Sequence, residues 1–121
     1  MERVLGIGGL FFRSKDPGAL AKWYQDMLGI DPVPGDYETE PWQQAAGPSV
    51  FAPFSEDTTY YPQSQQTMVN FRVRDLDAMI AQLRAGGTEV TPDPETYPNG
   101  RFARLHDPEG NAIELWQPAG E

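Results

Sequence analysis

The chain has 121 residues, the length of one domain, and its hydrophobic fraction of 39%, with 12% aromatic residues, is enough for a packed core. The 18 Asp and Glu residues against 9 Lys and Arg give a net charge of −9, which disfavours nucleic acid and anionic membrane surfaces as partners. The chain has no cysteine and a single histidine, His106, which excludes disulfides, thiolate metal sites, a cysteine nucleophile and metal sites built from several histidines of one chain.

Targeting signals are the next feature to consider. No apolar run approaches the roughly 20 residues that a membrane-spanning helix needs. The first residues, MERVLGIGG, are too short and too polar for a signal peptide. We therefore expect a cytoplasmic protein.

Two segments of the chain repeat one pattern. Arg13 and Asp16 recur as Arg72 and Asp75, 59 positions later, each Arg preceded by Phe. Each Asp suits a helix N-cap, and apolar residues then follow at helical spacing until glycine. The pattern predicts a helix after Asp16 with the stripe Leu20, Trp23, Tyr24, Met27 and Leu28, and a helix after Asp75 with the stripe Leu76, Met79, Ile80 and Leu83.

Strand signals surround both predicted helices. In the second half, alternation and turn residues predict strands over 68–74, 88–91, 101–106 and 112–116, with a turn at 107–111. In the first half, weaker candidates lie at 43–46 and 50–54. We therefore predict a single domain over 1–121, made of a first module (about 1–54), a linker (55–66) and a second module (about 67–121). The predicted fold is α+β: two βαβββ modules form a curled mixed sheet around a cleft, with the helices on the outer face.

Alternation along the predicted strands also assigns their faces. The apolar residues of alternating positions should pack under the helices: Val69, Phe71, Val73, Ala103, Leu105, Ile113 and Leu115. The opposite face should carry Asn70, Arg72, Phe102, Arg104, Glu114 and Trp116 and, through the repeat, Gly9, Phe11 and Arg13. A polar cleft lined with aromatic residues is the usual form of a small-molecule site, so we expect the ligand there.

The motifs resemble those of the vicinal-oxygen-chelate superfamily, which includes glyoxalases, bleomycin-resistance proteins and dioxygenases. The stretch Gly6–Phe12, followed by Asp16-Pro17, Trp23-Tyr24 and Leu28-Gly29, is similar to the opening of a first module. Asn70–Val73 resembles the opening of a second module, and Asp107–Asn111 with Ile113-Glu114-Leu115 resembles its closing hairpin. The resemblance implies the two-module fold. It does not select a reaction, because one fold hosts many functions.

In the metal-dependent members, the resemblance implies one ligand on the first and one on the last strand of each module. These four positions hold Gly9, Phe51, Met68 and Glu114. Glycine and phenylalanine have no donor atoms, and a methionine thioether suits soft ions rather than Mg, Mn, Fe(II) or Zn. We therefore predict no metal at the family position and no cofactor. A stoichiometric divalent ion in the purified protein, removed by chelator together with an activity, would contradict this.

Each remaining candidate has two interpretations. Glu114 is a general base or hydrogen-bond anchor inside the cleft, or a catalytically silent partner of an arginine. Arg13 and Arg72 form a cationic pocket for a carboxylate or phosphate, or pair with nearby Asp16 and Asp75. Asn70 contacts ligand or bonds a neighbouring loop. The predicted ligand-binding set is Phe11, Arg13, Trp42, Phe51, Asn70, Arg72, Phe102, Arg104 and Trp116, with the linker tyrosines Tyr60 and Tyr61 and the loop residue Tyr97 as its lid or rim.

Three functions compete. The first is a metal-independent small-molecule-binding protein of the glyoxalase and bleomycin-resistance type, which holds an anionic, aromatic-containing compound. The second is a glyoxalase-like lyase, isomerase or epimerase with Glu114 as base or metal ligand, aided in the metal case by His106. The third is an interaction module with no small ligand. The resemblance also implies a homodimer, with contact area near Val4-Leu5-Ile7 or Leu115-Trp116.

Overall fold

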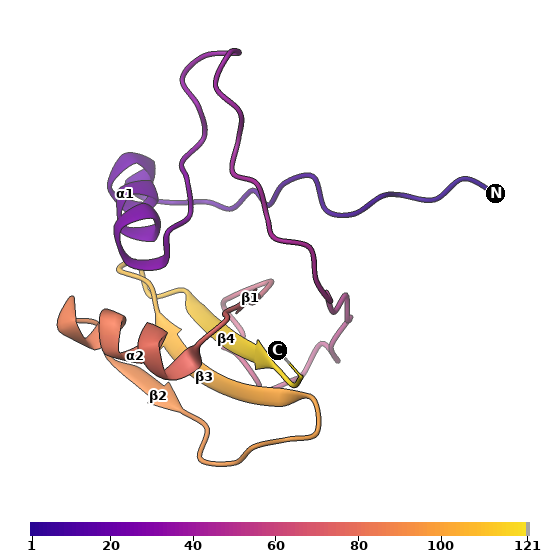
Figure 1. The fold of residues 1–121 in the computed structure, drawn as a ribbon, viewed down its shortest axis with the longest axis vertical. Helices are drawn as coiled ribbons and strands as arrows, with labels where there is room; N and C mark the ends of the chain where they lie inside the picture. The colour runs from indigo at the N-terminus through magenta and orange to yellow at the C-terminus, as the bar shows by residue number, and fades with distance from the viewer. Residues whose placement is uncertain (121) are drawn as a thin grey trace.

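The protein, seen in a computed structural model that describes residues 1–120, has two helices and four strands in this range. Residue 121, the predicted end of the second module, lies outside the described residues. In chain order (Figure 1) the elements are α1 (Pro17–Leu28), β1 (Val69–Arg72), α2 (Leu76–Ala85), β2 (Val90–Pro92), β3 (Gly100–His106) and β4 (Ala112–Pro118). The two helices have 12 and 10 residues, and neither is long and apolar enough to cross a membrane.

The four strands form one mixed sheet in the order β1-β4-β3-β2. β1 runs parallel to β4, whereas β3 is antiparallel to both β4 and β2. The β3–β4 connection is the predicted turn at 107–111, where buried Asp107 accepts hydrogen bonds from the backbone N–H of Glu109 (2.9 Å) and Asn111 (3.0 Å). The β3–β4 hairpin therefore lies at the centre of the sheet, and β1 and β2 are its edge strands.

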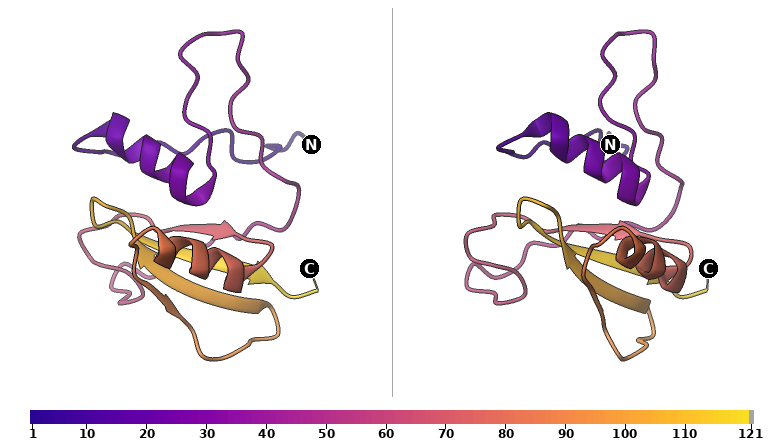
Figure 2. Two further views of the ribbon diagram at one scale, coloured as in Figure 1. Left: turned by 60° about the vertical axis from the view of Figure 1, so that its left-hand side comes forward. Right: turned by 90° about the vertical axis from the view of Figure 1, so that its left-hand side faces the viewer.

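Both helices pack on the same side of the sheet (Figure 2), as the alternation predicts. The core consists of residues from α2 and the four-stranded unit: Leu76, Ile80, Leu83, Val90, Ala103, Leu105, Ile113 and Leu115. Phe71 and Val73 pack against it from β1 and its end. Helix α1 contributes the predicted stripe residues Trp23, Tyr24, Met27 and Leu28. The predicted assignment is confirmed for these strand residues, whereas the contact of Val69 with the helices stays a prediction.

The predicted helix ends are confirmed as well. Asp16 accepts a hydrogen bond from Ala19 N at 3.2 Å, and Asp75 accepts one from Ala78 N at 3.0 Å. Gly29 ends α1 in the left-handed conformation, with φ of 71°. The two helices therefore begin alike, because each copy has an Asp side chain that caps its first turn. Their C-terminal ends differ, since Gly86 after α2 has φ of −85° and is not left-handed.

The prediction of two βαβββ modules in a curled sheet is wrong. The order β1-α2-β2-β3-β4 is a single βαβββ unit, and its sheet does not curl into a cleft. Residues 1–16 and 29–68 form no strand, so the strands expected near 9–13, 43–46 and 50–54 are absent there. The physical reason is local: glycines at 6, 8 and 9 and the Pro- and Gly-rich stretch 32–48 weaken extended pairing, and within residues 1–120 no strand lies beside them to supply hydrogen bonds.

The first half consequently leaves apolar side chains uncovered, and its N-terminal segment extends away from the sheet (Figure 1). Val4, Leu5 and Ile7 are exposed, as the predicted dimer contact requires. The alternative contact at Leu115-Trp116 is wrong, because β4 is an inner strand and both residues are buried. The homodimer itself stays a prediction.

Helix α1 is attached to the sheet through the closing turn. The Tyr24 hydroxyl donates to Asp107 Oδ2 at 2.7 Å, and Glu109 accepts from Ser14 Oγ at 2.7 Å and from Lys15 N at 2.8 Å. The hydrogen bonds of Ser14 and Lys15 lower the pKa of Glu109. One turn of five residues therefore holds the first helix on the second half of the chain.

Alkaline pH should weaken this attachment. Burial, together with the hydrogen bond to Asp107, raises the pKa of Tyr24 far above its usual value. A pKa that is higher in the folded chain stabilises the fold below about pH 10, where unfolded tyrosine is protonated, and this stabilisation is lost as the pH rises towards the folded pKa. We expect the free energy of unfolding to fall above pH ~10, and to fall less steeply in Tyr24→Phe, in urea titrations between pH 7 and 11. Tyr37→Phe, at a fully exposed tyrosine, is the control and should leave the wild-type slope unchanged. Equal slopes in Tyr24→Phe and wild type would contradict the assignment.

The start of β3 requires glycine. Gly100 has φ of 132°, and a Cβ atom there would clash with the backbone oxygen of Gln117 and lie 2.8 Å from Trp116 Nε1. We expect Gly100→Ala to lower the free energy of unfolding by about 2 kcal/mol, through backbone strain and displacement of β4. Gly8→Ala is the matched control, since nothing lies within 4 Å of its Cβ position. Equal urea midpoints for the two variants would show that β3 and β4 tolerate the methyl group.

Candidate functional site

The sheet face away from the helices carries two rungs of side chains that can recognise a ligand. Asn70, Glu114 and Arg104 lie side by side on β1, β4 and β3, because Asn70 pairs with Glu114 and Glu114 with Arg104. The next rung places Arg72 and Phe102 on either side of Trp116 in the same way. These six residues are the ones that alternation assigned to this face, and the sheet register brings them together.

Glu114 is the centre of the first rung. Its side chain is 9% exposed, and its two oxygens accept hydrogen bonds from three directions. Asn70 Nδ2 donates to Oε1 at 2.8 Å, while the Tyr60 hydroxyl at 2.6 Å and Arg104 Nε at 3.4 Å donate to Oε2. The buried carboxylate is thus compensated by one cationic and two neutral donors, as burial of a charge requires.

Residues 55–66, here called the strap, bring Tyr60 to this face. Arg104 Nη1 donates to the Tyr60 carbonyl at 2.7 Å, and the Arg104 Cζ atom lies 4.0 Å from the centre of the Tyr60 ring, a cation–π geometry. The side chain of Gln65 fastens the end of the strap, since it donates to Ala112 O and accepts from Ala112 N, both at 2.9 Å. The strap has no helix or strand of its own and is held by side chains.

The ionisation of Tyr60 is shifted by this arrangement. Burial raises the pKa of Tyr60 most, and the hydrogen bond to Glu114 raises it further, against an opposite effect of Arg104. The hydroxyl therefore stays protonated around neutral pH and acts as a donor. Glu114 in turn presents acceptor atoms only.

Aromatic rings form the second half of the face. The rings of Phe102 and Trp116 are parallel, with centroids 6.2 Å apart and 3° between their planes. Tyr97, on the loop between β2 and β3, packs edge-on against Phe102 at 6.0 Å, and Trp116 Nε1 donates to Asn99 O at 2.8 Å. Trp116 is buried and Phe102 is half-buried, so this rung places apolar rings next to the polar centre of Glu114 and Arg104, with Phe102 as its more accessible ring.

Arg72 has an unpredicted partner, and four other predicted ligand contacts come from the irregular first half of the chain. Arg72 Nη2 donates a hydrogen bond to the carbonyl oxygen of Ala45 at 2.7 Å. This partner is neither the ligand anion nor the carboxylate of Asp75, the two partners that the sequence predicted. Phe11 and Phe51 are 92% and 87% exposed and belong to no strand, and Arg13 and Trp42 also lie in the irregular first half. The described structure does not bring these four side chains to the rungs, and their role in binding stays a prediction.

The family's metal does not fit the residues present. Gly9 has no side chain, Met68 offers only a thioether, Phe51 has no donor atom, and the oxygens of Glu114 already face N–H and O–H donors. In the part of the chain that the structure describes, no three His, Asp or Glu side chains gather at metal-binding distance. His106 pairs with Ala112 and is exposed. We derive no step through a metal.

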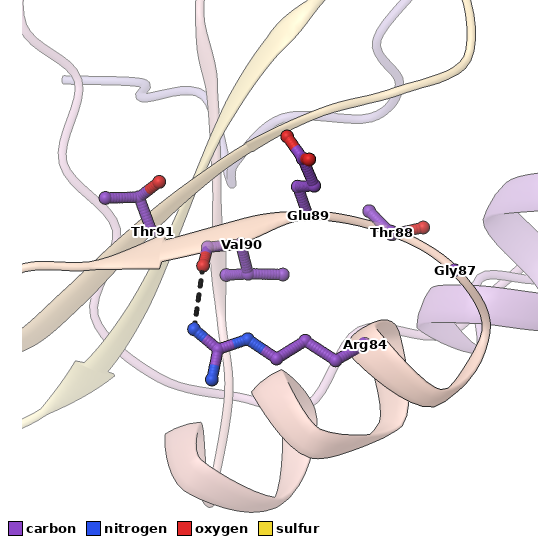
Figure 3. A pocket seen from close by; sticks show the side chains of 6 residues that line it. All are labelled: Arg84, Gly87, Thr88, Glu89, Val90 and Thr91. Atoms are coloured by element: carbon purple, nitrogen blue, oxygen red, sulfur yellow. Dashed lines mark hydrogen bonds between the residues drawn. The ribbon is translucent and has the colours of Figure 1, made fainter.

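Depressions on the surface lie away from these rungs. One is bounded by the end of α2 and the start of β2 (Figure 3), where the Arg84 guanidinium crosses towards the strand and donates to Val90 O at 3.0 Å. Another lies between Trp23, Thr88 and the turn at Asp107 and Pro108. Arg84 is used there to hold helix to strand, and Asp107 is used in the turn between β3 and β4. Neither depression contains Glu114 with its neighbouring arginine and aromatic rings, so the rung face is the better candidate site.

Two residues of this site were not in the predicted set. Tyr60 was expected only at the rim, yet its hydroxyl is the closest donor to Glu114. Gln65 was not singled out, although both ends of its amide bond the start of β4. No periodic pattern marks either residue, because the strap is irregular; the one signal was a pair of aromatic residues inside a polar segment.

Comparison with known proteins extends these observations. The chain is similar to TnmS3, an antibiotic binding protein from Streptomyces sp. CB03234, with 27% identity, 87% of this chain and 88% of that chain covered, and a TM-score of 0.55. A glyoxalase/bleomycin resistance protein from the same organism is 26% identical over 85% of this chain and 92% of that one, with a TM-score of 0.52. A glyoxylase/bleomycin resistance protein/dioxygenase domain from Frankia sp. EAN1pec, 16% identical, shares the fold over 96% and 99% of the two chains, with a TM-score of 0.61.

No curated protein matches the chain significantly. The family of glyoxalase-like domains matches residues 9–116, nearly the whole chain and all of the described helices and strands up to Trp116. The resemblance seen in the sequence motifs is thereby confirmed: the chain belongs to the family of glyoxalase-like domains.

Proposed function

We propose that the protein is a metal-independent small-molecule-binding protein that holds an anionic, aromatic-containing compound on the rung face of its sheet. The observation that carries this proposal is the juxtaposition of buried Glu114 and half-buried Arg104 with the parallel rings of Phe102 and Trp116. Flat apolar surface with a few convergent polar groups is the usual composition of a ligand site. TnmS3, described as an antibiotic binding protein, supports the same class of function.

The charge of the face supports an anionic ligand. The protein has a net charge of −9, yet the two rungs carry two arginines, Arg72 and Arg104, against one carboxylate, Glu114. An anion approaching elsewhere meets a repulsive surface, whereas the rungs are locally positive. Arginine also stacks on aromatic planes, which suits a ligand that combines a ring with a negative group.

The contacts of Glu114 favour binding over proton abstraction. A general base needs a lone pair directed at the substrate proton, within about 2.6–3.2 Å. The oxygens of Glu114 instead accept from Tyr60, Asn70 and Arg104. The carboxylate is therefore arranged as an acceptor within a network, which supports an anchoring role in place of the lyase or isomerase chemistry.

The test is a thermal-shift screen of aromatic acids, phenols and antibiotics, followed by titration of the hits against two arginine variants. We expect Arg104→Gln to weaken binding about tenfold, the effect of one charge-assisted contact. Arg101→Gln is the matched control: Arg101 lies on the same strand but bonds Asp77 of α2 at 2.9 Å on the opposite face. A screen without any hit, or hits whose affinity is unchanged in Arg104→Gln, would refute the proposed function.

A further inference from the structure

A phenol group, the side chain of Tyr60, occupies the centre of the candidate site. Its hydroxyl oxygen lies 2.6 Å from Glu114 Oε2, and its ring faces the Arg104 guanidinium at 4.0 Å. The residue is 45% exposed although its hydroxyl contacts a carboxylate of a residue that is only 7% exposed. The phenol thus reaches inward from the surface, as a bound ligand would.

The two halves of this contact differ in how firmly they are held. Asn70, Glu114 and Arg104 stand on paired strands, with their backbones in the sheet register. Tyr60 stands on the strap, which has no regular structure and is fastened by the side chains of Arg104 and Gln65. Segments with few backbone hydrogen bonds open at low free-energy cost, whereas paired strands do not. The three sheet residues therefore form the fixed part of the contact. The Tyr60 side chain is the part that a ligand can displace.

The fixed part of the contact specifies what can replace Tyr60. An ionised carboxylate only accepts hydrogen bonds, so the group placed against Glu114 must donate one. A carboxylate of the ligand would be repelled at this point, and an ether or methyl group would leave Glu114 Oε2 without its closest donor. The guanidinium of Arg104 favours the face of an aromatic ring beside that donor.

We propose that the ligand carries a hydroxyl group on an aromatic ring and that this phenol takes the place of the Tyr60 side chain between Glu114 and Arg104. The inference rests on the proposed function and narrows its ligand to phenolic aromatic compounds. The negative group of such a ligand lies away from Glu114. The Tyr60 side chain then has the same phenol group as the ligand and competes with it for Glu114 and Arg104.

The first experiment removes the Tyr60 side chain by mutation and adds the same phenol group as a free compound in solution. Tyr60→Ala is titrated with 4-methylphenol, the Tyr60 side chain itself, and with toluene, 4-methylanisole and 4-methylbenzoate, using NMR shifts of residues on β3 and β4. We expect 4-methylphenol to bind Tyr60→Ala about tenfold more tightly than any of the other three, because only it donates to the carboxylate. Tyr61→Ala, at the neighbouring strap residue whose ring packs on Phe54, is the matched control and should resemble the wild type. Equal binding of toluene and 4-methylphenol, preference for 4-methylbenzoate, or no binding of 4-methylphenol would each overturn the inference.

The second experiment keeps the ring and removes only the hydroxyl, so that the strap retains its packing. In Tyr60→Phe the competitor lacks its hydrogen bond, so we expect 4-phenylphenol to bind about tenfold more tightly than to wild type, and about tenfold more tightly than biphenyl binds the same variant. Tyr61→Phe should show the wild-type affinity for both compounds. An unchanged affinity of Tyr60→Phe for 4-phenylphenol would overturn the inference.

The two proposals fail in different ways. The proposed function fails when no compound of the screen binds wild-type protein in a manner sensitive to Arg104→Gln. The phenol inference fails when compounds do bind with that sensitivity, but aromatic acids without hydroxyl groups bind as well as phenols and the Tyr60 variants bind them no differently. A phenol preference in both Tyr60 variants that is lost in Arg104→Gln supports both.

Discussion

In the Tyr60→Ala background, where no side chain competes for the site, replacing Glu114 with alanine is expected to weaken the binding of 4-phenylphenol by about ten- to a hundredfold, because one hydrogen bond to a charged group contributes roughly 1.5–3 kcal/mol. In the otherwise wild-type chain, Glu114→Ala should release the strap, since the Tyr60 hydroxyl loses its acceptor 2.6 Å away and Arg104 loses the carboxylate that orients it. Binding is measured by calorimetry and strap release by hydrogen exchange of the backbone amides of residues 58–66, which should speed up severalfold.

Two further variants sharpen this prediction. Glu56→Ala removes an exposed carboxylate from the strap itself and should change neither readout, which controls for the loss of charge. Glu114→Gln keeps one amide oxygen as acceptor, so the strap should stay closer to wild type while phenol binding falls, because the acceptor is no longer charged. If Glu114→Ala leaves the affinity of the Tyr60→Ala protein for 4-phenylphenol unchanged, Glu114 is not part of the site.

Replacing Leu115 with alanine should lower the free energy of unfolding by about 3–4 kcal/mol, the typical cost of a leucine cavity in a closed core. Leu115 is 0% exposed and lies on the inner strand β4, where it pairs with Phe71 of β1 and Ala103 of β3. Its side chain belongs to the core under α2, where rigid neighbours on two sides prevent the cavity from closing. Urea unfolding monitored by circular dichroism measures the change, with the slope of the transition unchanged.

The matched control is a leucine-to-alanine substitution at a fully exposed residue. Leu5 is 106% exposed in the N-terminal segment, so Leu5→Ala should change the free energy of unfolding by less than about 0.5 kcal/mol. A loss of stability at Leu5 equal to that at Leu115 would show that the N-terminal segment is buried in solution, in contradiction to the exposure described. A loss at Leu115 below 1 kcal/mol would contradict its place in the core.

Local sequence patterns predicted most of the second half of the chain. Both helices begin at the expected Asp caps and end at the expected glycines, because capping and helical periodicity depend on residues within one or two turns. The strands that became β3 and β4 were predicted within one or two residues, and β1 and β2 within two. Their alternation also identified the residues of the rung face, since every second residue of a strand must lie on the same side of its sheet.

The first half shows where the same patterns failed. The repeat that links Arg13 to Arg72 predicted two equal modules, yet only the residues around Arg72 form a strand. A strand needs a partner for its backbone, and sequence similarity to a paired segment does not supply one. Thus Arg72, paired through β1, lies on the rung face, while its repeat equivalent Arg13 lies in an exposed segment.

The acidic composition, the missing donors at the family's metal positions, the capped helices and the side chains of the rung face could all be derived from the sequence, because each follows from residue chemistry or short-range geometry. That Asn70, Glu114 and Arg104 form one rung could not be derived from it, because register between β1, β4 and β3 depends on pairing across the sheet. The tertiary structure also decided that Tyr60 fills the centre of the site. An irregular strap has no periodicity from which the position of its side chains can be derived, so the contact that defines the ligand chemistry is visible only in three dimensions.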